Sequence, residues 1–231
     1  MHCNRIFLLF FALLLVLTAC SRGLAATPDA QVHSEPFLEQ LTFLGDSITA
    51  HMAARSSVSR DRIWCAKNRY LNLDSRITYA KVLAPDTGEE QTIAELAARI
   101  RPRYLVITLG VDYGVYYYRD EQQTFSYYYE KLLDAIHEAS PDTVLLVQSI
   151  FPVTRESKAI TNEMIDNANR TLFSLCEQKG IFYLDTQSVL RDGQGFLRAE
   201  YCNSADGIHL SEAGYTAVLD YIASKEGEIV T

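Results

Sequence analysis

The sequence has 231 residues and is 48% hydrophobic, which suits one globular domain with a full core. It has 21 lysine and arginine residues against 29 aspartate and glutamate residues, so the formal net charge is −8 at pH 7. This balance argues against nucleic acid as a partner, because phosphate binding needs clustered basic side chains.

The first residues have the pattern of an export signal. Arg5 precedes an unbroken apolar stretch, residues 6–17, and about twelve apolar residues are too few for a membrane-spanning helix. The following Leu-Thr-Ala-Cys resembles a bacterial lipobox, whose cysteine carries lipid after cleavage. We therefore expect residues 1–20 to be a lipoprotein signal peptide and Cys20 to anchor an exported protein at the outer face of the cell membrane. The alternative is an ordinary signal peptide cut near Ala25 or Ala26.

A short tether is expected between the leader and the domain. Residues 21–36 are small, polar and irregular in pattern, and we place the folded domain at 37–231. Three cysteines remain in this part, so at most one internal disulfide is possible; Cys65 and Cys202 are the favoured pair if one exists, but free buried thiols for these two and Cys176 are the better expectation. No metal-ligand spacing occurs, and no cofactor is expected.

The first predicted strand leads directly to a serine. Leu41 to Leu44 is a short apolar run, Gly45 allows a tight turn, and apolar residues then continue at helical spacing. At the first turn of a helix, Ser47 would lie among unpaired N–H groups and the positive end of the helix dipole, which stabilise a forming anion. Ser47 is therefore a candidate nucleophile, and the alternative is a serine that only caps the helix.

Strands and helices alternate along the rest of the chain. Apolar runs predict further buried strands at 63–66, 104–109, 143–148 and 181–184. Periodic spacing predicts helices at 92–100, from a cap at Asp120, at 158–179 with Gly180 as its stop, and after a cap at Ser211. This order predicts an α/β fold in which a parallel sheet carries helices on both faces.

Asp206-Gly207-Ile208-His209 precedes the last helix and could complete a catalytic site. A serine becomes nucleophilic when a histidine accepts its proton and a carboxylate orients that histidine, and Asp206 and His209 can supply this pair. His51, four residues after Ser47 and on the same helix face, is a competing base, but no carboxylate near it in sequence would orient it. His137 is expected to be a surface or packing residue.

Gly45-Asp46-Ser47-Ile48 together with Asp206-x-x-His209 resembles the SGNH (GDSL-type) esterase and acylhydrolase superfamily, from about Leu41 to Tyr221. The resemblance implies a three-layer sandwich with five parallel strands in the flavodoxin-like order and a site outside their carboxyl ends. The Gly-x-Ser-x-Gly elbow of other α/β-hydrolases is absent at Ser47. Asp46 is expected to tie loops together rather than to take part in chemistry.

The resemblance also implies an oxyanion hole made from the serine N–H, a glycine N–H after the second strand and an asparagine amide after the third. Here the third strand is followed by Gly110-Val111-Asp112-Tyr113, so Asp112 stands in the asparagine's place. An ionised carboxylate donates no hydrogen bond and repels an oxyanion. The loop after Trp64 has no glycine, and Asn68 is its nearest match by position. The candidate oxyanion and substrate residues are Ser47, Asn68, Gly110, Asp112 and Tyr113.

Tyrosines gather after the third predicted strand. Those at 127–129 are expected to pack on a helix, whereas Tyr113 and those at 116–118 could equally form a substrate wall. A tyrosine ring with a hydroxyl at its edge suits a sugar better than a fatty chain.

The sequence is compatible with two functions. The first is an extracytoplasmic serine esterase that removes acetyl or other short acyl groups from a small-molecule or glycan ester, with Ser47 as nucleophile, His209 as base and Asp206 as the residue that orients the base. A lipase or lysophospholipase-type acylhydrolase is a variant of this hypothesis. The second is a surface-anchored binding protein on a catalytically weakened scaffold, suggested by Asp112 and the missing glycine.

Overall fold

The computed structural model describes residues 35–111 and 113–230. Its centre is a five-stranded parallel sheet in the order β2-β1-β5-β6-β7, which confirms the flavodoxin-like arrangement. The strands are β1 (Leu41–Gly45), β2 (Ile63–Trp64), β5 (Tyr104–Thr108), β6 (Val144–Gln148) and β7 (Phe182–Leu184). β1 and β5 are buried along their whole length because helices cover both faces of the sheet.

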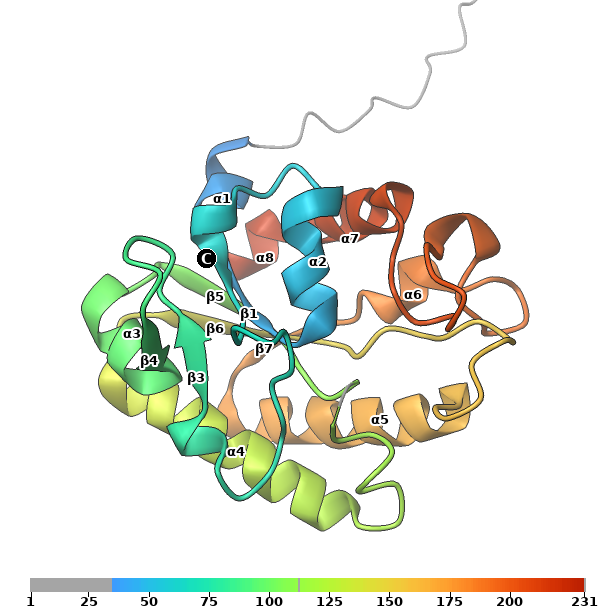
Figure 1. Cartoon of the computed structure of the whole chain (residues 1–231), viewed down its shortest axis with the longest axis horizontal. Coiled ribbons are helices and arrows are strands. Elements are labelled where there is room, and N and C mark those ends of the chain that lie inside the picture. The colour runs from blue at the N-terminus through green and yellow to red at the C-terminus, as the bar shows by residue number, and fades with distance from the viewer. Residues whose placement is uncertain (1–34, 112, 231) are drawn as a thin grey trace, which may run out of the picture. The chain divides into compact units, whose positions relative to one another are not determined.

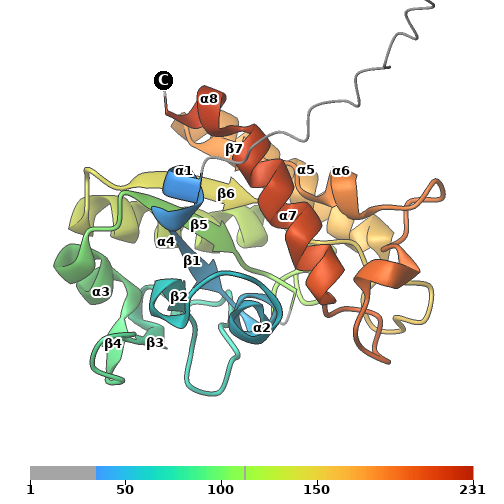
Figure 2. The same cartoon turned by 90° about the horizontal axis from the view of Figure 1, so that it is seen from above.

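The helices form two layers on either side of this sheet (Figure 1 and Figure 2). One layer contains α1 (Glu35–Glu39), α2 (Ser47–Arg55) and α7 (Glu212–Ser224), with the short α6 (Gln187–Leu190) and α8 (Glu226–Ile229) beside α7. The other contains α3 (Ile93–Ile100), α4 (Gln122–Ala139) and α5 (Asn162–Lys179). Three short 3₁₀ turns complete the described helical segments: η1 (Arg60–Arg62), η2 (Ile77–Tyr79) and η3 (Ala199–Tyr201).

Helix boundaries follow their capping side chains. Gly180 ends α5 in the left-handed conformation and Ser211 caps α7, as predicted. Two predicted starts were wrong. The N-cap of α4 is Glu121 rather than Asp120, whose carboxylate instead lies 3.4 Å from Arg119 Nε. α5 starts at Asn162 rather than near residue 158, because Thr161 Oγ1 accepts a hydrogen bond from the Met164 N–H.

A hairpin that the pattern did not predict lies beyond β2. β3 (Lys81–Leu83) and β4 (Glu90–Thr92) pair antiparallel, and the Leu83 N–H donates to the Cys65 carbonyl at 3.0 Å. The hairpin therefore lies beside the residues that directly follow β2, which is an edge strand of the parallel sheet. Thr92 also forms a capping box with Glu95 at the start of α3.

α7, near the end of the domain, packs against α1 and α2 at its beginning. Tyr215 is buried, and its hydroxyl donates to the Ile48 carbonyl at 2.6 Å. This bond fixes the start of α7 against the first turn of α2. The loop that carries Asp206 and His209, just before α7, is thereby brought to Ser47.

Several predictions concern residues outside the described ranges. Arg5, Cys20 and the leader at 1–20, together with most of the tether at 21–36, lie there, so the anchor remains a prediction. α1 already starts at Glu35, just ahead of the expected domain start. Among the described helices, none has the length and apolar character needed to cross a membrane. Cys65 and Cys176 are buried free thiols, and Cys202 is a half-buried one.

Candidate active site

Three side chains from distant parts of the sequence meet above the carboxyl end of β1. Ser47, the first residue of α2, places its Oγ 3.1 Å from His209 Nε2, and His209 Nδ1 lies 3.2 Å from Asp206 Oδ2. Because the carboxylate can only accept, the proton of the neutral imidazole belongs on Nδ1, which leaves the Nε2 lone pair facing the serine hydroxyl. This is the geometry of an activated serine.

The Asp206 carboxylate is held by its own loop. Its Oδ1 accepts from the Ile208 N–H at 2.9 Å and from the Ser204 hydroxyl. Burial alone would raise the pKa of Asp206, but the hydrogen bonds from Ser204 and Ile208 and the neighbouring His209 outweigh it and lower the pKa below its usual value. Asp206 is therefore ionised at neutral pH. Ser204, which also accepts from the His209 N–H at 3.1 Å, is a site residue that no sequence spacing signalled.

Gly207 makes this loop possible. Its φ is +74°, and a Cβ there would meet Thr154 Oγ1 at 2.2 Å. The close approach lets the Gly207 carbonyl accept from the Thr154 N–H at 2.9 Å. The loop after β6 thus supports the loop that carries His209.

Asp46 organises the opposite side of the site. Its Oδ1 accepts from the Ile48 N–H at 3.3 Å, and its Oδ2 accepts from the N–H groups of Gly110 and Val111, each at 3.1 Å. This buried carboxylate therefore joins the start of α2 to the loop after β5. The prediction that Asp46 ties loops together is confirmed.

The sequence matches the model of the GDSL-like lipase/acylhydrolase family over residues 43–217. The chain belongs to this family. The matched range includes the serine at the start of α2 and the loop with Asp206 and His209.

Solved structures share the fold at low sequence identity. A candidate acylhydrolase from Bacteroides fragilis NCTC 9343 has 14% identity and a TM-score of 0.54, with 84% of this chain and 88% of that chain covered. A carbohydrate esterase family 3 protein from Talaromyces cellulolyticus has 17% identity and a TM-score of 0.52, covering 82% and 97%. A GDSL-like lipase from Bacteroides thetaiotaomicron VPI-5482 has 13% identity and a TM-score of 0.51, covering 86% and 93%. No curated protein matches the sequence.

The oxyanion residues expected of a GDSL-like acylhydrolase are only partly visible. The Gly110 N–H is engaged by Asp46, so Gly110 shapes the turn, with φ +129°, instead of offering its N–H to an oxyanion. Asp112 lies outside the described residues. The Tyr113 carbonyl accepts from the Leu73 N–H at 3.2 Å, and its ring stacks on Tyr117 at 3.9 Å. The loops after β5 and β2 are thereby joined beside the site.

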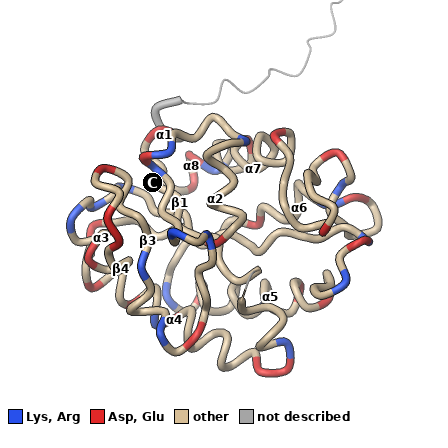
Figure 3. Tube along the Cα trace, in the orientation of Figure 1, with Lys and Arg blue, Asp and Glu red and all other residues tan. Residues whose placement is uncertain are grey.

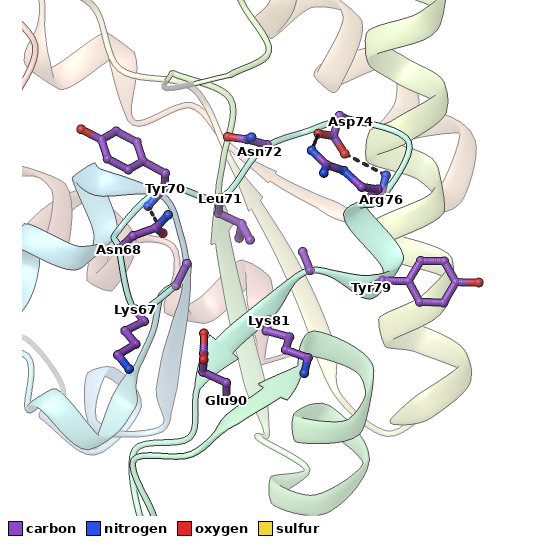
Figure 4. Close-up of a pocket in the computed structure, with 12 residues that line it drawn as sticks. Lys67, Asn68, Tyr70, Leu71, Asn72, Asp74, Arg76, Tyr79, Lys81 and Glu90 are labelled. Carbon is purple, nitrogen blue, oxygen red and sulfur yellow. Dashed lines mark hydrogen bonds and ion pairs between the residues drawn. The ribbon is translucent and has the colours of Figure 1, made fainter.

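Asn68 lies on the loop after β2, where its Oδ1 accepts from the Tyr70 N–H at 3.1 Å. It lines a pocket of about 920 Å³ between this loop, η2 and the β3–β4 hairpin (Figure 4). Within the described residues, no hydrogen bond joins Asn68 to Ser47 or His209. Figure 4 also shows an Asp74–Arg76 pair at the pocket, 2.9 Å apart, with the Tyr70 and Tyr79 rings directed to opposite sides.

His51 is close to the site but does not replace His209. Its ring centroid lies 4.5 Å from that of His209, and its Nδ1 and Nε2 each lie 3.5 Å from a guanidinium nitrogen, of Arg55 and Arg69 respectively. Burial, followed by His209 and these two arginines, lowers the pKa of His51, which is therefore neutral at neutral pH. His209 is the histidine in hydrogen-bond contact with the Ser47 hydroxyl. His137, on α4, is exposed.

The part of the chain that the structure describes has no group of three or more histidine, cysteine or acidic side chains placed to hold a metal ion.

Proposed function

We propose that the chain is a serine esterase that removes acetyl or other short acyl groups from a glycan. The observation that carries the proposal is the hydrogen-bonded array of Ser47, His209 and Asp206, with separations of 3.1 and 3.2 Å, at the start of a helix in a GDSL-like acylhydrolase. No other described serine has a histidine and a carboxylate in this arrangement.

The reaction follows from the atoms in contact. Ser47 Oγ attacks the ester carbonyl carbon while His209 Nε2 accepts the hydroxyl proton. Collapse of the tetrahedral intermediate breaks the bond to the alcohol oxygen, which leaves with the proton from His209. A water molecule, deprotonated in turn by His209, attacks the acyl-serine and releases the carboxylic acid. Asp206 stabilises the imidazolium in both halves, and the oxyanion forms at the positive end of α2, where we expect the Ser47 backbone to contribute.

The short acyl group in this proposal comes from the sequence resemblance to esterases and acylhydrolases. A cavity of about 10 Å³ is bounded by Asp46, Ile48 and Ile208, but neither Ser47 nor His209 lines it. The acyl length is therefore decided by the comparison of acetyl with long-chain esters in the test below.

A glycan is supported by the tyrosines at the site's margin. Tyr113 and Tyr117 form a stacked pair, and Tyr117 and Tyr116 are exposed. Flat aromatic faces with polar edges suit a sugar ring. A structural neighbour, the Talaromyces cellulolyticus protein, is named a carbohydrate esterase, which is consistent with this assignment.

The test is hydrolysis of p-nitrophenyl acetate by the purified protein and by Ser47→Ala. We expect turnover that is lost in the variant, and faster cleavage of acetylated glycans than of long-chain acyl esters. Turnover that survives in Ser47→Ala would refute the nucleophile, and preference for long acyl chains would refute the substrate class.

A second candidate is a binding protein on a weakened esterase scaffold. It is favoured by two observations: Asp46 engages the Gly110 N–H, and the loop after β2 lacks a glycine. Tight binding of an acetylated glycan by wild-type protein, with no turnover over hours, would favour this candidate.

We also propose that the protein is exported and lipid-anchored through Cys20. The support is the sequence of the leader alone. Wild-type protein should partition with membranes, and Cys20→Ala should move to the soluble fraction. Equal partitioning of both forms would contradict the anchor.

A further inference from the structure

A second pocket, of about 400 Å³, lies between α2 and the loop after β2. All of its charged lining residues are basic: Arg55, Arg60, Lys67 and Arg69. We call it the basic pocket. Its volume lies in the range of small-ligand sites. Figure 3 shows blue segments beside α2 near the middle of the view, in a chain whose net charge is −8.

The basic side chains of this pocket have no acidic partners. Within residues 35–111 and 113–230, none of the four forms an ion pair, although arginine or lysine pairs with carboxylates at many other places in the structure. Clustered like charges repel each other in the free protein, and an anion placed among them relieves that repulsion. The cluster therefore has the electrostatics of an anion site.

Arg69 and His51 are neighbouring residues in the lining of the basic pocket. Arg69 has a φ of +67°, a left-handed backbone that is unusual for a residue other than glycine. This turn directs its guanidinium to within 3.5 Å of His51 Nε2, while Arg55 lies at the same distance from Nδ1. The lowered pKa of His51 keeps the imidazole neutral between the two arginines.

The basic pocket adjoins the nucleophile. His51 lines it, the His51 ring lies 4.5 Å from the His209 ring, and His209 Nε2 lies 3.1 Å from Ser47 Oγ. An anionic group in the pocket would thus be separated from Ser47 by the two neighbouring imidazole rings of His51 and His209. Ala66 and Lys67 line both this pocket and the 920 Å³ pocket, so the two pockets adjoin at this part of the loop after β2.

We propose that the basic pocket binds an anionic group of the substrate, so that the preferred substrate is an acylated acidic glycan. The group is a carboxylate or a phosphate next to the acylated sugar, since guanidinium groups bind both through paired, charge-assisted hydrogen bonds. This inference rests on the proposed esterase function for its substrate, but its binding test does not depend on turnover.

The binding test uses full-length protein carrying Ser47→Ala. The probes are trigalacturonate for the carboxylate, a glycerol phosphate trimer for the phosphate, and galactotriose as the neutral counterpart. We expect at least one anionic probe to bind about tenfold or more tightly than galactotriose, less so at high salt. The anion that binds identifies the group. Equal binding of charged and neutral probes would overturn the proposal.

A matched pair of double variants assigns that binding to the basic pocket. Arg60→Gln/Arg69→Gln should lose the preference for the anion. Arg101→Gln/Arg103→Gln removes the same charge at the amino end of the central strand β5, away from the carboxyl ends where Ser47 lies, and Arg101 also has a left-handed backbone, with φ +49°. This control should keep the preference. Loss of the preference in both variants, or in neither, would show that the anion does not bind in the pocket.

Kinetics then separate this inference from the proposed function. Wild-type kcat/KM should be about tenfold or more higher for an acetylated anionic trimer than for acetylated galactotriose, and that ratio should fall towards one only in Arg60→Gln/Arg69→Gln. Equal rates on both esters would refute the anionic substrate and leave the esterase standing. An absence of turnover on every ester would refute the esterase, while the binding test would still decide the anion site.

Discussion

Two aspartates, one in each sequence motif, both accept several hydrogen bonds and serve different purposes. Asp46 is 1% exposed, and the bonds described for it come from the backbone N–H groups of Ile48, Gly110 and Val111. The Asp206 side chain is 49% exposed and accepts from Ser204, Ile208 and the His209 imidazole. The buried carboxylate of Asp46 fixes the backbone of two neighbouring segments, and the partly solvated carboxylate of Asp206 orients the imidazole of His209. The difference teaches that the surroundings of an aspartate, more than its place in a motif, decide its role.

The largest expected effect concerns the base that Asp206 serves. His209→Ala should lower kcat by about 10⁴- to 10⁶-fold, because the serine hydroxyl loses its proton acceptor. Labelling by a fluorophosphonate probe should disappear with it. His51→Ala is the matched control, since it removes the neighbouring imidazole and should leave labelling in place. The opposite result would make His51 the base and remove Asp206 from the site.

Asp206→Asn should lower kcat by about 10⁴-fold, because the amide can hold the wrong imidazole tautomer. The free energy of unfolding should change by about 1 kcal/mol or less, since the side chain is half exposed. Steady-state kinetics and urea unfolding measure the two quantities. A large loss of stability would place Asp206 in the same class as Asp46.

Asp46→Asn should show the reverse pattern. An amide can accept on only one side, so either the Ile48 N–H or the pair from Gly110 and Val111 loses its acceptor in a buried position. We expect the free energy of unfolding to fall by about 2–4 kcal/mol. Activity per folded molecule should fall less than in Asp206→Asn. If Asp46→Asn unfolds at the wild-type urea concentration, the tie between the loops is not stabilising.

A third aspartate, Asp112, lies outside the described residues, and its prediction rests on sequence position alone. Restoring an amide as a hydrogen-bond donor should raise turnover of an acetyl ester by about 10²- to 10³-fold in Asp112→Asn, or roughly 3–4 kcal/mol. The gain should be smaller at acidic pH, where a protonated Asp112 can itself donate. Activity abolished at every pH would give the carboxylate a positive role, such as gripping a substrate hydroxyl.

The smallest expected effect is the pH dependence of stability from Asp206. Its pKa in the folded protein is below the usual value, so its contribution is present above the unfolded carboxyl's pKa of about 3.9 and is lost as pH falls through the folded pKa. The stability of wild type relative to Asp206→Asn should therefore decrease between about pH 5 and pH 2. Urea unfolding at several pH values tests this. A difference independent of pH would mean that folding does not shift the pKa of Asp206.

The sequence was informative wherever a pattern is local. Continuous apolar runs located the five strands of the parallel sheet, and Gly180 and Ser211 marked helix ends through their own backbone and side-chain chemistry. The candidate catalytic residues Ser47, Asp206 and His209 were predicted because they occur in two short motifs that are typical of the family. The β3–β4 hairpin was missed because Glu90-Gln91-Thr92 is short and polar, without the alternation of a half-buried strand.

Contacts between loops could not be predicted in the same way. The bond from Ser204 to Asp206 depends on a turn that Gly207 permits, and the basic pocket depends on Arg69 meeting a helix that begins with Ser47. Arg55 and Lys67 carry no periodic signal that would place them together. Such clusters become visible only when the sheet has brought the carboxyl ends of β1 and β2 side by side.

The Tyr215–Ile48 bond has a consequence for when the protein can act during its synthesis. Ser47 is translated early, and His209 follows 162 residues later on a loop held by α7. Until α7 has emerged and docked on α2, the serine hydroxyl has no base and is an ordinary alcohol. Synthesis and docking of the last long helix therefore set the moment at which the proposed nucleophile can be activated.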